Sequence, residues 1–576
     1  MLKDLLTQRL LPYRKLLIVV VVFQAIQAVA GLVLPTINAD IIDRGVARGD
    51  IGIIWRLGGW MVVVTLVQVA FAIGAVHAGS KVATGFGRDA RAVMFARVNS
   101  FSAREVNTFG APSLITRITN DVQQVQMLVL TTCTLLVAAP FTAIGGLILA
   151  VQQDAALSWV IVVAVPIVAV LLGTVISKMV PTFRKMQEFI DRINEILREQ
   201  LTGVRVVRAF GREDDQMEKF RAGNALLTAT ALRGGRLMGL MFPTATLIVN
   251  LSSVAVVWLA GGRIADGRMD VGSLVAYLTY LTQILMAVLM ATFMAALLPR
   301  ASVSAERIQE IMSTESSIRH SVDPVSEIDG PIRLELRRVG FRYPGADEPV
   351  LADVSVTVNA GETLAIIGST GSGKTTLVNI MARLIDPTEG AVLINGVDLT
   401  RLAPEVLGSL YGYVPQRPYL FSGTIASNLR YGKDEATQAD MWEALDISQA
   451  TEFVRERGLD APIAQGGANV SGGQRQRLSI ARAVIRRPRI YIFDDAFSAL
   501  DLATDARLRA SLQPHLSDAV TVIIGQRVST IRHADQIMVL EDGRVVGLGT
   551  HAELEESCAT YQEILASQAM TAGVGQ

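Results

Sequence analysis

The sequence predicts an α-helical domain with six membrane spans followed by an α/β domain. The first 300 residues contain six long apolar stretches, whereas short apolar strands and charged turns alternate in the rest. In the second half, a glycine-rich loop joins a strand-like run to a helical pattern. Hydrophobic residues make up 51% of the 576 residues and charged residues only 18%, a balance too apolar for an ordinary soluble enzyme.

Composition also excludes several functions. The 53 basic and 53 acidic residues give a net charge of zero, which argues against a nucleic-acid-binding protein. The two cysteines, Cys133 and Cys558, lie in an apolar run and near the end of a polar half, so we expect neither a structural disulfide nor a cysteine metal site. The five histidines show no metal-ligand spacing.

Six stretches are long enough to cross a membrane. A hydrocarbon core of about 30 Å requires roughly 20 apolar residues in a helix. The first stretch is too long for a cleaved signal peptide and continues into a second span, so we expect it to be retained. The predicted spans are 16–37, 57–77, 127–151, 157–180, 237–261 and 271–298.

Basic residues predict the orientation of these spans. Residues 1–15 and the two long loops, 78–126 and 181–236, together hold 21 Lys and Arg residues, against five in the loops on the other side. The positive-inside rule therefore makes both chain ends and both long loops cytoplasmic. Residues 1–12 alternate apolar and polar types, which suits either a short amphipathic helix on the inner membrane surface or a disordered tail.

The long loops keep a helix-forming composition with few breakers, so we expect each to be a helical hairpin that extends beyond the membrane. The predicted domains are a transmembrane domain over 1–300 and an α/β domain over 332–570. Serine, proline and glycine in the segment 301–331 predict a linker between them.

A phosphate-binding loop follows the strand-like run 363–367. The residues fit G-x-x-x-x-G-K-[ST], with a strand before and a helical pattern after them. Glycines let backbone N–H groups turn toward phosphate oxygens, and the helix N-terminus adds partial positive charge. We expect Lys374 to contact the β- and γ-phosphates of ATP and the Thr375 hydroxyl to bind Mg²⁺. The loop comprises Gly368, Ser369, Thr370, Gly371, Ser372, Gly373, Lys374, Thr375 and Thr376.

Two further motifs follow. The apolar run 490–493 ends in Asp494, as in a strand whose terminal carboxylate holds Mg²⁺. Before it, a serine and two glycines open a helix, an arrangement that also suits an anion. These residues are Ser471, Gly472, Gly473 and Gln474.

With these motifs the chain resembles ABC transporters, specifically half-transporters of the exporter fold, over almost its whole length. The resemblance implies that Ser471–Gln474 is the signature motif, which binds the ATP held by a partner chain; Val470 stands where leucine is usual. It also implies that Tyr343 stacks on adenine and that Gln416 is the Q-loop glutamine, which reaches Mg²⁺. Asp501 then lies in the D-loop at the dimer interface. The segments 110–122 and 203–220 resemble the loops that carry the coupling helices.

The chain departs from the family pattern at two catalytic positions. Asp495 stands where the family has the glutamate that positions the attacking water, and its carboxylate is one methylene shorter. A displacement of about 1 Å can cost roughly 100-fold in rate. Gln526 stands where the family has the switch-loop histidine; it can still donate a hydrogen bond to the γ-phosphate but cannot titrate.

Both departures affect hydrolysis and leave the binding groups in place. The chain therefore resembles the degenerate-site subunit of bacterial heterodimeric multidrug or lipid exporters of the inner membrane. This resemblance implies a second half-transporter chain with an intact glutamate and histidine. A homodimer with slow sites is the alternative.

The substrate is less well defined by the sequence. The spans contain few ionisable residues, which weakly favours amphipathic drugs or lipids as the transported small molecule, with membrane lipid as the surrounding partner and no nucleic acid. Export, import by an exporter-fold protein, and lipid flipping by a homodimer all stay open. An ATP-gated channel or sensor is disfavoured, because a channel should show pore-lining charges.

Overall fold

The computed structural model describes residues 2–295, 297–319 and 321–573. The described chain divides into two units. One comprises the chain up to Asn99 together with Gly110–Thr314, and the other comprises Ser100–Phe109 together with the chain from Glu315 onward.

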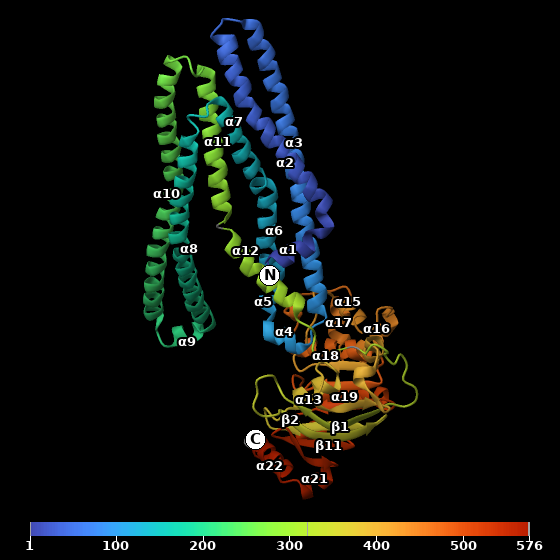
Figure 1. Ribbon diagram of the computed structural model, residues 1–576. Helices are drawn as coiled ribbons and strands as arrows, with labels where there is room; N and C mark the ends of the chain where they lie inside the picture. Colours follow the sequence, from blue (N-terminus) through green and yellow to red (C-terminus); the bar gives the residue numbers. More distant parts are fainter. Residues whose placement is uncertain (1, 296, 320, 574–576) are drawn as a thin grey trace. The chain divides into compact units, whose positions relative to one another are not determined.

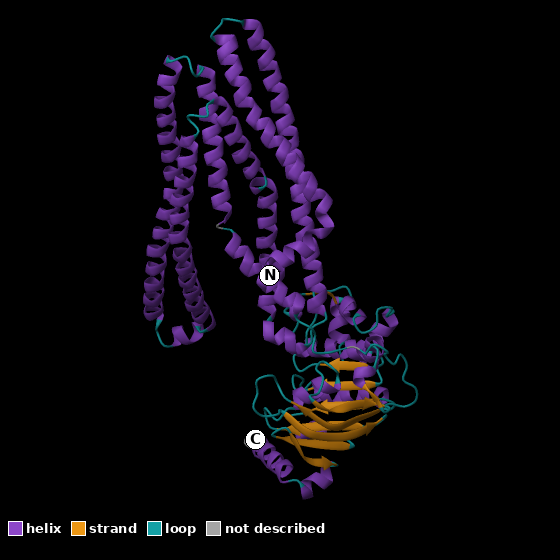
Figure 2. Ribbon diagram, in the orientation of Figure 1, coloured by secondary structure: helices purple, strands orange, loops and turns teal. Residues whose placement is uncertain are grey.

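The described part of the first unit is built from helices (Figures 1 and 2). Six helical stretches among the described residues are long and apolar enough to cross a membrane, which confirms the predicted number of spans. The helices are α1 (Leu2–Leu10), α2 (Arg14–Asp40), α3 (Ile51–Asn99), α5 (Ala111–Thr116), α6 (Val122–Thr131), α7 (Ala138–Gln153), α8 (Trp159–Thr202), α9 (Val204–Ala209), α10 (Glu213–Ala265), α11 (Val271–Ala295) and α12 (Leu298–Ser313).

Several helices are far longer than a membrane span. α8 and α10 have 44 and 53 residues, where about 20 cross a bilayer, so they continue beyond it as the sequence predicted. They pack against each other, and α9 closes the hairpin (Figure 1). The described side chains of 183–222 are all exposed or only partly buried, so the end of this hairpin has no buried core of its own.

Two predictions for the first unit need correction. The segment 301–331 is not a linker throughout, because α12 continues to Ser313 with Ala305 and Ile308 fully buried. Packing of these apolar side chains, in a helix that contacts α6 and α3, outweighs the serines that suggested a loop. The disordered-tail alternative for residues 1–12 is also wrong: α1 is a helix that packs against α12 and α3, with Leu5 buried.

A polar side chain within the spans joins two helices. Gln24 of α2 is buried, and its Nε2 donates to the carbonyl oxygens of Cys133 and Thr134 at 3.1 and 3.0 Å. These carbonyls belong to a π-helical turn, η4 (Thr132–Leu136). A π-turn shifts the backbone hydrogen-bond pattern, and side-chain donors compensate for the displaced carbonyls where no water is present.

The residues described for the second unit form three sheets with helices around them. A six-stranded sheet has the order β12-β11-β3-β10-β9-β6, a four-stranded antiparallel sheet the order β2-β1-β4-β5, and β7 pairs with β8. The strands are β1 (Arg333–Phe341), β2 (Leu351–Asn359), β3 (Thr363–Gly368), β4 (Glu389–Ile394), β5 (Val397–Asp398), β6 (Tyr411–Val414), β7 (Gly423–Thr424), β8 (Pro462–Ile463), β9 (Ile490–Asp494), β10 (Val520–Ile524), β11 (Gln536–Glu541) and β12 (Arg544–Gly549).

Eleven α-helices accompany the sheets in the described part of this unit. α13 follows β3 directly, and α18 opens at the predicted signature motif. They are α4 (Ala103–Phe109), which comes from the first long loop, α13 (Lys374–Met381), α14 (Pro404–Leu410), α15 (Ile425–Arg430), α16 (Gln438–Ile447), α17 (Thr451–Arg457), α18 (Gly472–Val484), α19 (Leu502–Leu516), α20 (Val528–Ile531), α21 (His551–Ser557) and α22 (Ala559–Gly573).

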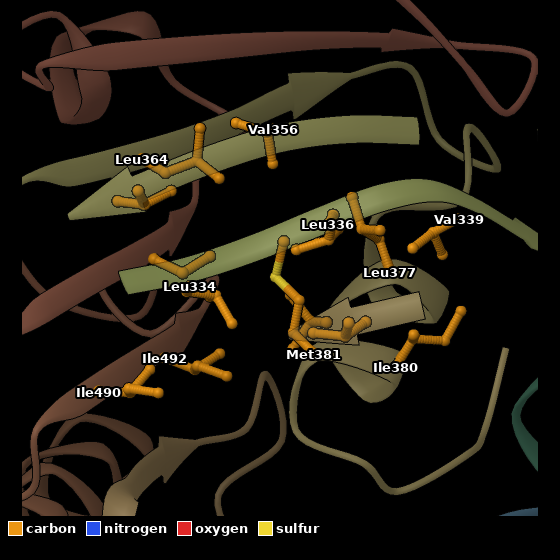
Figure 3. Close-up of a cluster of buried hydrophobic side chains, with 14 of the residues drawn as sticks. Leu334, Leu336, Val339, Val356, Leu364, Leu377, Ile380, Met381, Ile490 and Ile492 are labelled. Carbon is orange, nitrogen blue, oxygen red and sulfur yellow. The ribbon is translucent and has the colours of Figure 1, made fainter. Parts of the chain in front are cut away.

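The main core of this unit lies between the two larger sheets. Apolar side chains of β1 and β2 meet those of β3 and β9, and α13 fills the space between them with Leu377 and Met381 (Figure 3). Strands such as β9 are buried along their whole length, as expected for parallel strands covered on both faces. This packing holds the ends of the parallel strands in a fixed relation.

Candidate nucleotide-binding site

Four neighbouring parallel strands end at one edge of the six-stranded sheet, and a predicted site residue ends or follows each of them. The phosphate-binding loop follows β3, Gln526 follows β10, Asp494 ends β9, and Gln416 follows β6. Ligands of open α/β sheets bind outside the carboxyl ends of the strands. The fold therefore brings together residues that are more than 150 positions apart in the chain.

The phosphate-binding loop has the backbone that its glycines allow. Gly371 and Gly373 have φ values of 91° and 98°, in the left-handed region that side chains disfavour. A Cβ atom on Gly373 would also lie 2.9 Å from the carbonyl oxygen of Val350. The Lys374 ammonium donates to the carbonyl oxygens of Gly368 and Ser369 at 2.8 and 2.6 Å, which places it inside the loop.

The loop opens on a cleft of about 650 Å³. Gln416 and Gln526 lie on its wall together with most of the loop, and the far wall comes from β11 and α22. The lining residues are Val350, Ile367, Gly368, Ser369, Thr370, Gly371, Gly373, Lys374, Thr375, Thr376, Gln416, Gln526, Leu540, Glu541, Thr560, Glu563, Ile564, Ser567 and Gln568.

Two adjacent carboxylates lie at the end of β9, and one of them contacts Gln416 and Gln526 of the cleft. Asp494 and Asp495 are 3% and 9% exposed. Burial, together with the charge of Asp495, raises the pKa of Asp494 to about 6, although Lys374 opposes the shift. Burial likewise lowers the pKa of Lys374, against the attraction of both carboxylates. Ionisable groups with perturbed pKa values beside a cleft, here Asp494 and Lys374, are typical of a functional site.

The two residues that depart from the family pattern are in contact. Gln526 Nε2 donates to Asp495 Oδ2 at 2.8 Å, and Gln416 Nε2 approaches the same oxygen at 3.4 Å. Asp495 itself has a φ of 49°, a conformation that non-glycine residues rarely adopt. The turn after β9 thus presents this carboxylate to two amide groups.

The predicted adenine-stacking residue lies beside the loop. The Tyr343 hydroxyl is 3.3 Å from the Thr376 hydroxyl, and its ring packs edge-on against Phe341 at 4.8 Å between centroids. Tyr343 is 41% exposed, as a residue that stacks on a ligand must be before the ligand binds.

The signature residues lie elsewhere in this unit. Ser471 caps α18 in a reciprocal arrangement: its hydroxyl accepts from the Gln474 N–H, and Gln474 Oε1 accepts from the Ser471 N–H. Asp501 likewise caps α19 by accepting from the Thr504 N–H at 2.9 Å. None of the described residues Ser471, Gly472, Gly473, Gln474 and Asp501 lines the cleft.

Comparisons with known proteins identify the family. Residues 17–288 match the family described as ABC transporter transmembrane region, and residues 351–498 match the family described as ABC transporter. An uncharacterized ABC transporter ATP-binding protein of Mycobacterium tuberculosis is 52% identical over 579 residues, covering 100% of both chains. The chain belongs to the ABC transporters. This ABC transporter is therefore a multi-pass membrane protein whose ATP-binding domain drives transport.

Two further relatives bear on this transporter. A fatty acid ABC transporter ATP-binding/permease protein of M. tuberculosis is 32% identical over 454 residues, which cover 78% of this chain and 71% of the relative. A solved structure of a bacterial Atm1-family ABC exporter with ATP bound matches with a TM-score of 0.80 and 23% identity, covering 98% of each chain. The transporter thus has the exporter fold.

The sequence did not predict the part that the C-terminal helix has in this ATP-binding domain. α22 contributes Thr560, Glu563, Ile564, Ser567 and Gln568 to the cleft. These residues form no recognisable motif, and only their i, i+3, i+4, i+7 and i+8 spacing places them on one helical face. Only the folded domain shows that this face of α22 lines the cleft.

Proposed function

We propose that this chain exports amphipathic or hydrophobic substrates as one subunit of a heterodimeric ABC transporter, and that its own ATP site binds nucleotide but hydrolyses it slowly. The observation that supports this most strongly is the contact between Gln526 and Asp495. Both residues that should carry hydrolysis are altered, and they are engaged with each other, while the groups expected to bind ATP are intact.

The proposed binding groups surround the phosphate-binding loop. Lys374 and the loop amides hold the phosphates, and Tyr343 stacks on adenine. The N-terminus of α13, which begins at Lys374, adds the helix dipole in the same place. Each group keeps the residue type that the chemistry requires, so we expect affinity for ATP to be ordinary.

The residues also fit a magnesium ion. Mg²⁺ prefers hard oxygen ligands, and the Thr375 hydroxyl, the Gln416 side-chain carbonyl and the Asp494 carboxylate are of that kind. Asp494 is nearly buried, and its pKa is raised to about 6. Burial makes the ionised carboxylate unfavourable, and a cation bound nearby would stabilise it. The ion would supply charge neutralisation of the phosphates.

Slow hydrolysis follows from what Asp495 can reach. Its side chain is one methylene shorter than the usual glutamate, and Oδ2 already accepts from Gln526. An amide can donate to this oxygen or to a γ-phosphate, but it cannot take a proton from attacking water. The proposed site can therefore hold ATP in place, but it lacks a well-placed group to take a proton from the attacking water.

A second chain is proposed from two features. Ser471 and Gly473 do not line this chain's cleft, which suits residues that complete a partner's site. The hairpin of α8, α9 and α10 ends in exposed apolar side chains, with Leu201, Val206 and Phe210 at 76%, 61% and 76% exposure. Exposed apolar patches of this kind mark surfaces for protein partners.

The substrate class and orientation are likewise proposed. An apolar pocket of about 300 Å³ lies among α8, α10 and α11, with Thr246, Thr282 and Met286 on its wall. A flexible thioether beside hydroxyls suits amphipathic molecules, and one relative is named for fatty acids. The basic loops favour an orientation with both chain ends in the cytoplasm, and the bacterial origin of the relatives suits the inner membrane.

The test is purification of the chain alone and with its co-purified native partner, followed by ATPase and vesicle transport assays. We expect the chain alone to bind Mg-ATP with little turnover, and the pair to hydrolyse ATP and move lipid-like substrates. Robust ATPase activity from the pure homodimer would contradict the heterodimer proposal.

A further inference from the structure

The C-terminal helix α22 reaches the nucleotide cleft and also touches the loop that carries Gln526. Gln568 Nε2 donates to the backbone carbonyl oxygen of Gln526 at 2.7 Å. Its Oε1 accepts from the backbone N–H of Val528 at 2.8 Å. One side chain thus bonds the backbone on both sides of Arg527.

The chemistry of these two contacts determines the orientation of the Gln568 amide. A carbonyl oxygen only accepts and a backbone N–H only donates, so Nε2 must face Gln526 and Oε1 must face Val528. A glutamate, which has no donor in its ionised form, could satisfy only the second contact. The pairing therefore requires an amide of this length at position 568.

The contact at Val528 satisfies a helix terminus that has no local cap. Val528 is the first residue of α20, and the preceding residue Arg527 makes no side-chain capping hydrogen bond. The first N–H groups of a helix have no intrahelical acceptor. Gln568 supplies that acceptor from an element 40 residues further along the chain.

The other side of the loop is held by the sheet. The Gly525 N–H donates to the carbonyl oxygen of Ile366 in β3 at 3.2 Å. Gln526 therefore lies between a backbone contact to the sheet and the Gln568 contact. Its side chain extends from this anchored segment to Asp495 Oδ2.

We propose that Gln568 is a positioning residue of the nucleotide site, which holds the loop 525–528 so that the Gln526 amide faces the Asp495 carboxylate and the γ-phosphate position. The inference rests on the proposed role of Gln526 at the γ-phosphate. It makes the C-terminal helix part of the ATP site, and it means that movement of α22 changes how the site distinguishes ATP from ADP.

The experiment compares Gln568→Ala, Gln568→Glu and Gln526→Ala in the full chain, with Gln562→Ala as the matched control. Gln562 lies on the same helix and also donates to a backbone carbonyl, that of Glu555 at 2.7 Å, but it does not line the cleft. Binding of Mg-ATP and Mg-ADP is measured by calorimetry, and thermal unfolding shows whether each variant is folded.

We expect Gln568→Ala and Gln568→Glu to weaken ATP binding about threefold to tenfold, the range for one or two lost hydrogen bonds. ADP binding should be unchanged, because ADP has no γ-phosphate. Combining Gln568→Ala with Gln526→Ala should add little to Gln526→Ala alone, since one acts through the other. The control should bind both nucleotides normally.

Different results separate the two proposals. If Gln526→Ala weakens ATP binding but Gln568→Ala does not, the positioning role is overturned and the proposed function stands. If Gln526→Ala itself leaves ATP binding unchanged, the proposed role of Gln526 fails. Equal loss of ATP and ADP binding in a folded Gln568→Ala variant would show a general structural effect and would also overturn the positioning role.

Discussion

Gln526 Nε2 donates a 2.8 Å hydrogen bond to Asp495 Oδ2, so the two residues that replace the usual hydrolytic pair are partners of each other. They lie after neighbouring parallel strands, β10 and β9, whose last residues Ile524 and Asp494 are in register. A change at either position alters the surroundings of the other. The two departures are therefore coupled, and we expect their effects on hydrolysis to be non-additive.

Restoring the family residues should raise hydrolysis at this site. In Asp495→Glu with Gln526→His, we expect the longer carboxylate to reach the attacking water and the imidazole to replace the amide at the proposed γ-phosphate position. Groups of this kind are worth roughly 2–4 kcal/mol elsewhere, so we expect a gain of about tenfold or more in ATP turnover. The measurement uses a complex whose partner glutamate is changed to glutamine, so that only this site reports.

The single substitutions are the controls for that experiment. Asp495→Glu alone should gain less than the pair, because Gln526 still occupies one carboxylate oxygen. Flat hydrolysis in the double variant, with an intact signature motif in the partner, would mean that these two residues are not limiting.

Lys374→Ala should abolish nucleotide binding at this chain's own site. The ammonium lies inside the phosphate-binding loop, bonded to the carbonyl oxygens of Gly368 and Ser369. Its removal would delete the positive charge proposed to face the phosphates, and we expect ATP affinity to fall about 100-fold or more. Equilibrium binding of a fluorescent ATP analogue measures the effect.

Lys433→Ala is the matched control for the loss of a lysine. Lys433 pairs with Asp440 at 3.1 Å and lines no part of the cleft. Its replacement should leave ATP affinity unchanged. Equal losses for the two variants would contradict a specific phosphate contact by Lys374.

Changing the signature motif should impair the partner's site and spare this one. Ser471→Ala with Gly473→Asp removes a hydroxyl and adds a negative charge where a partner's γ-phosphate is proposed to lie. Neither residue lines this chain's cleft, so ATP binding here should persist while turnover by the complex falls about 10-fold or more. ATPase assays and nucleotide binding of the same preparation measure both effects.

Thr437→Ala provides the comparison for helix capping. Thr437 caps α16 with the same reciprocal arrangement that Ser471 makes at α18. Loss of either cap, by Thr437→Ala or by Ser471→Ala, should cost ~1 kcal/mol in stability. Only the signature variant should also lose turnover. If Thr437→Ala and the signature variant lost turnover equally, Ser471 would act only as a helix cap.

A buried ion pair should stabilise the first unit. The Asp154 side chain is 3% exposed, accepts from Arg263 Nε at 2.6 Å, and also accepts from the N–H groups of Ala156 and Leu157. Asp154→Asn removes the charge that pairs with Arg263, and we expect ~2 kcal/mol of destabilisation. Thermal unfolding in detergent reports the change.

Asp266→Asn is its control in a neighbouring loop. Asp266 is 3.9 Å from Arg268 with both side chains exposed, where pairs contribute little. The melting temperature should be almost unchanged. A fall as large as that of Asp154→Asn would show that the buried pair has no special role.

Patterns within single segments were enough to predict most of this fold. Runs of apolar residues predicted six spans because a bilayer requires about 20 of them in each helix. The phosphate-binding loop could be read because its glycines are needed for the φ values of 91° and 98° that the structure has. The signature helix opened where predicted because Ser471 and Gln474 cap it locally.

Segments with mixed signals were predicted less well. Serines in 301–313 suggested a loop, yet α12 forms there because Ala305 and Ile308 pack against other helices. The amphipathic pattern of 1–12 allowed a tail, but burial of Leu5 orders α1 as a helix. In both cases tertiary packing outweighed the local preference.

The composition of the site itself depended on contacts between distant segments. Asp495 and Gln526 could each be assigned from motifs, but their hydrogen bond exists only because β9 and β10 pair in parallel and end at one edge. Gln568 belongs to no motif, and its two backbone contacts arise from where α22 packs. Local sequence encodes backbone conformation and burial, whereas which side chains meet is set by the packing of strands and helices far apart in the chain.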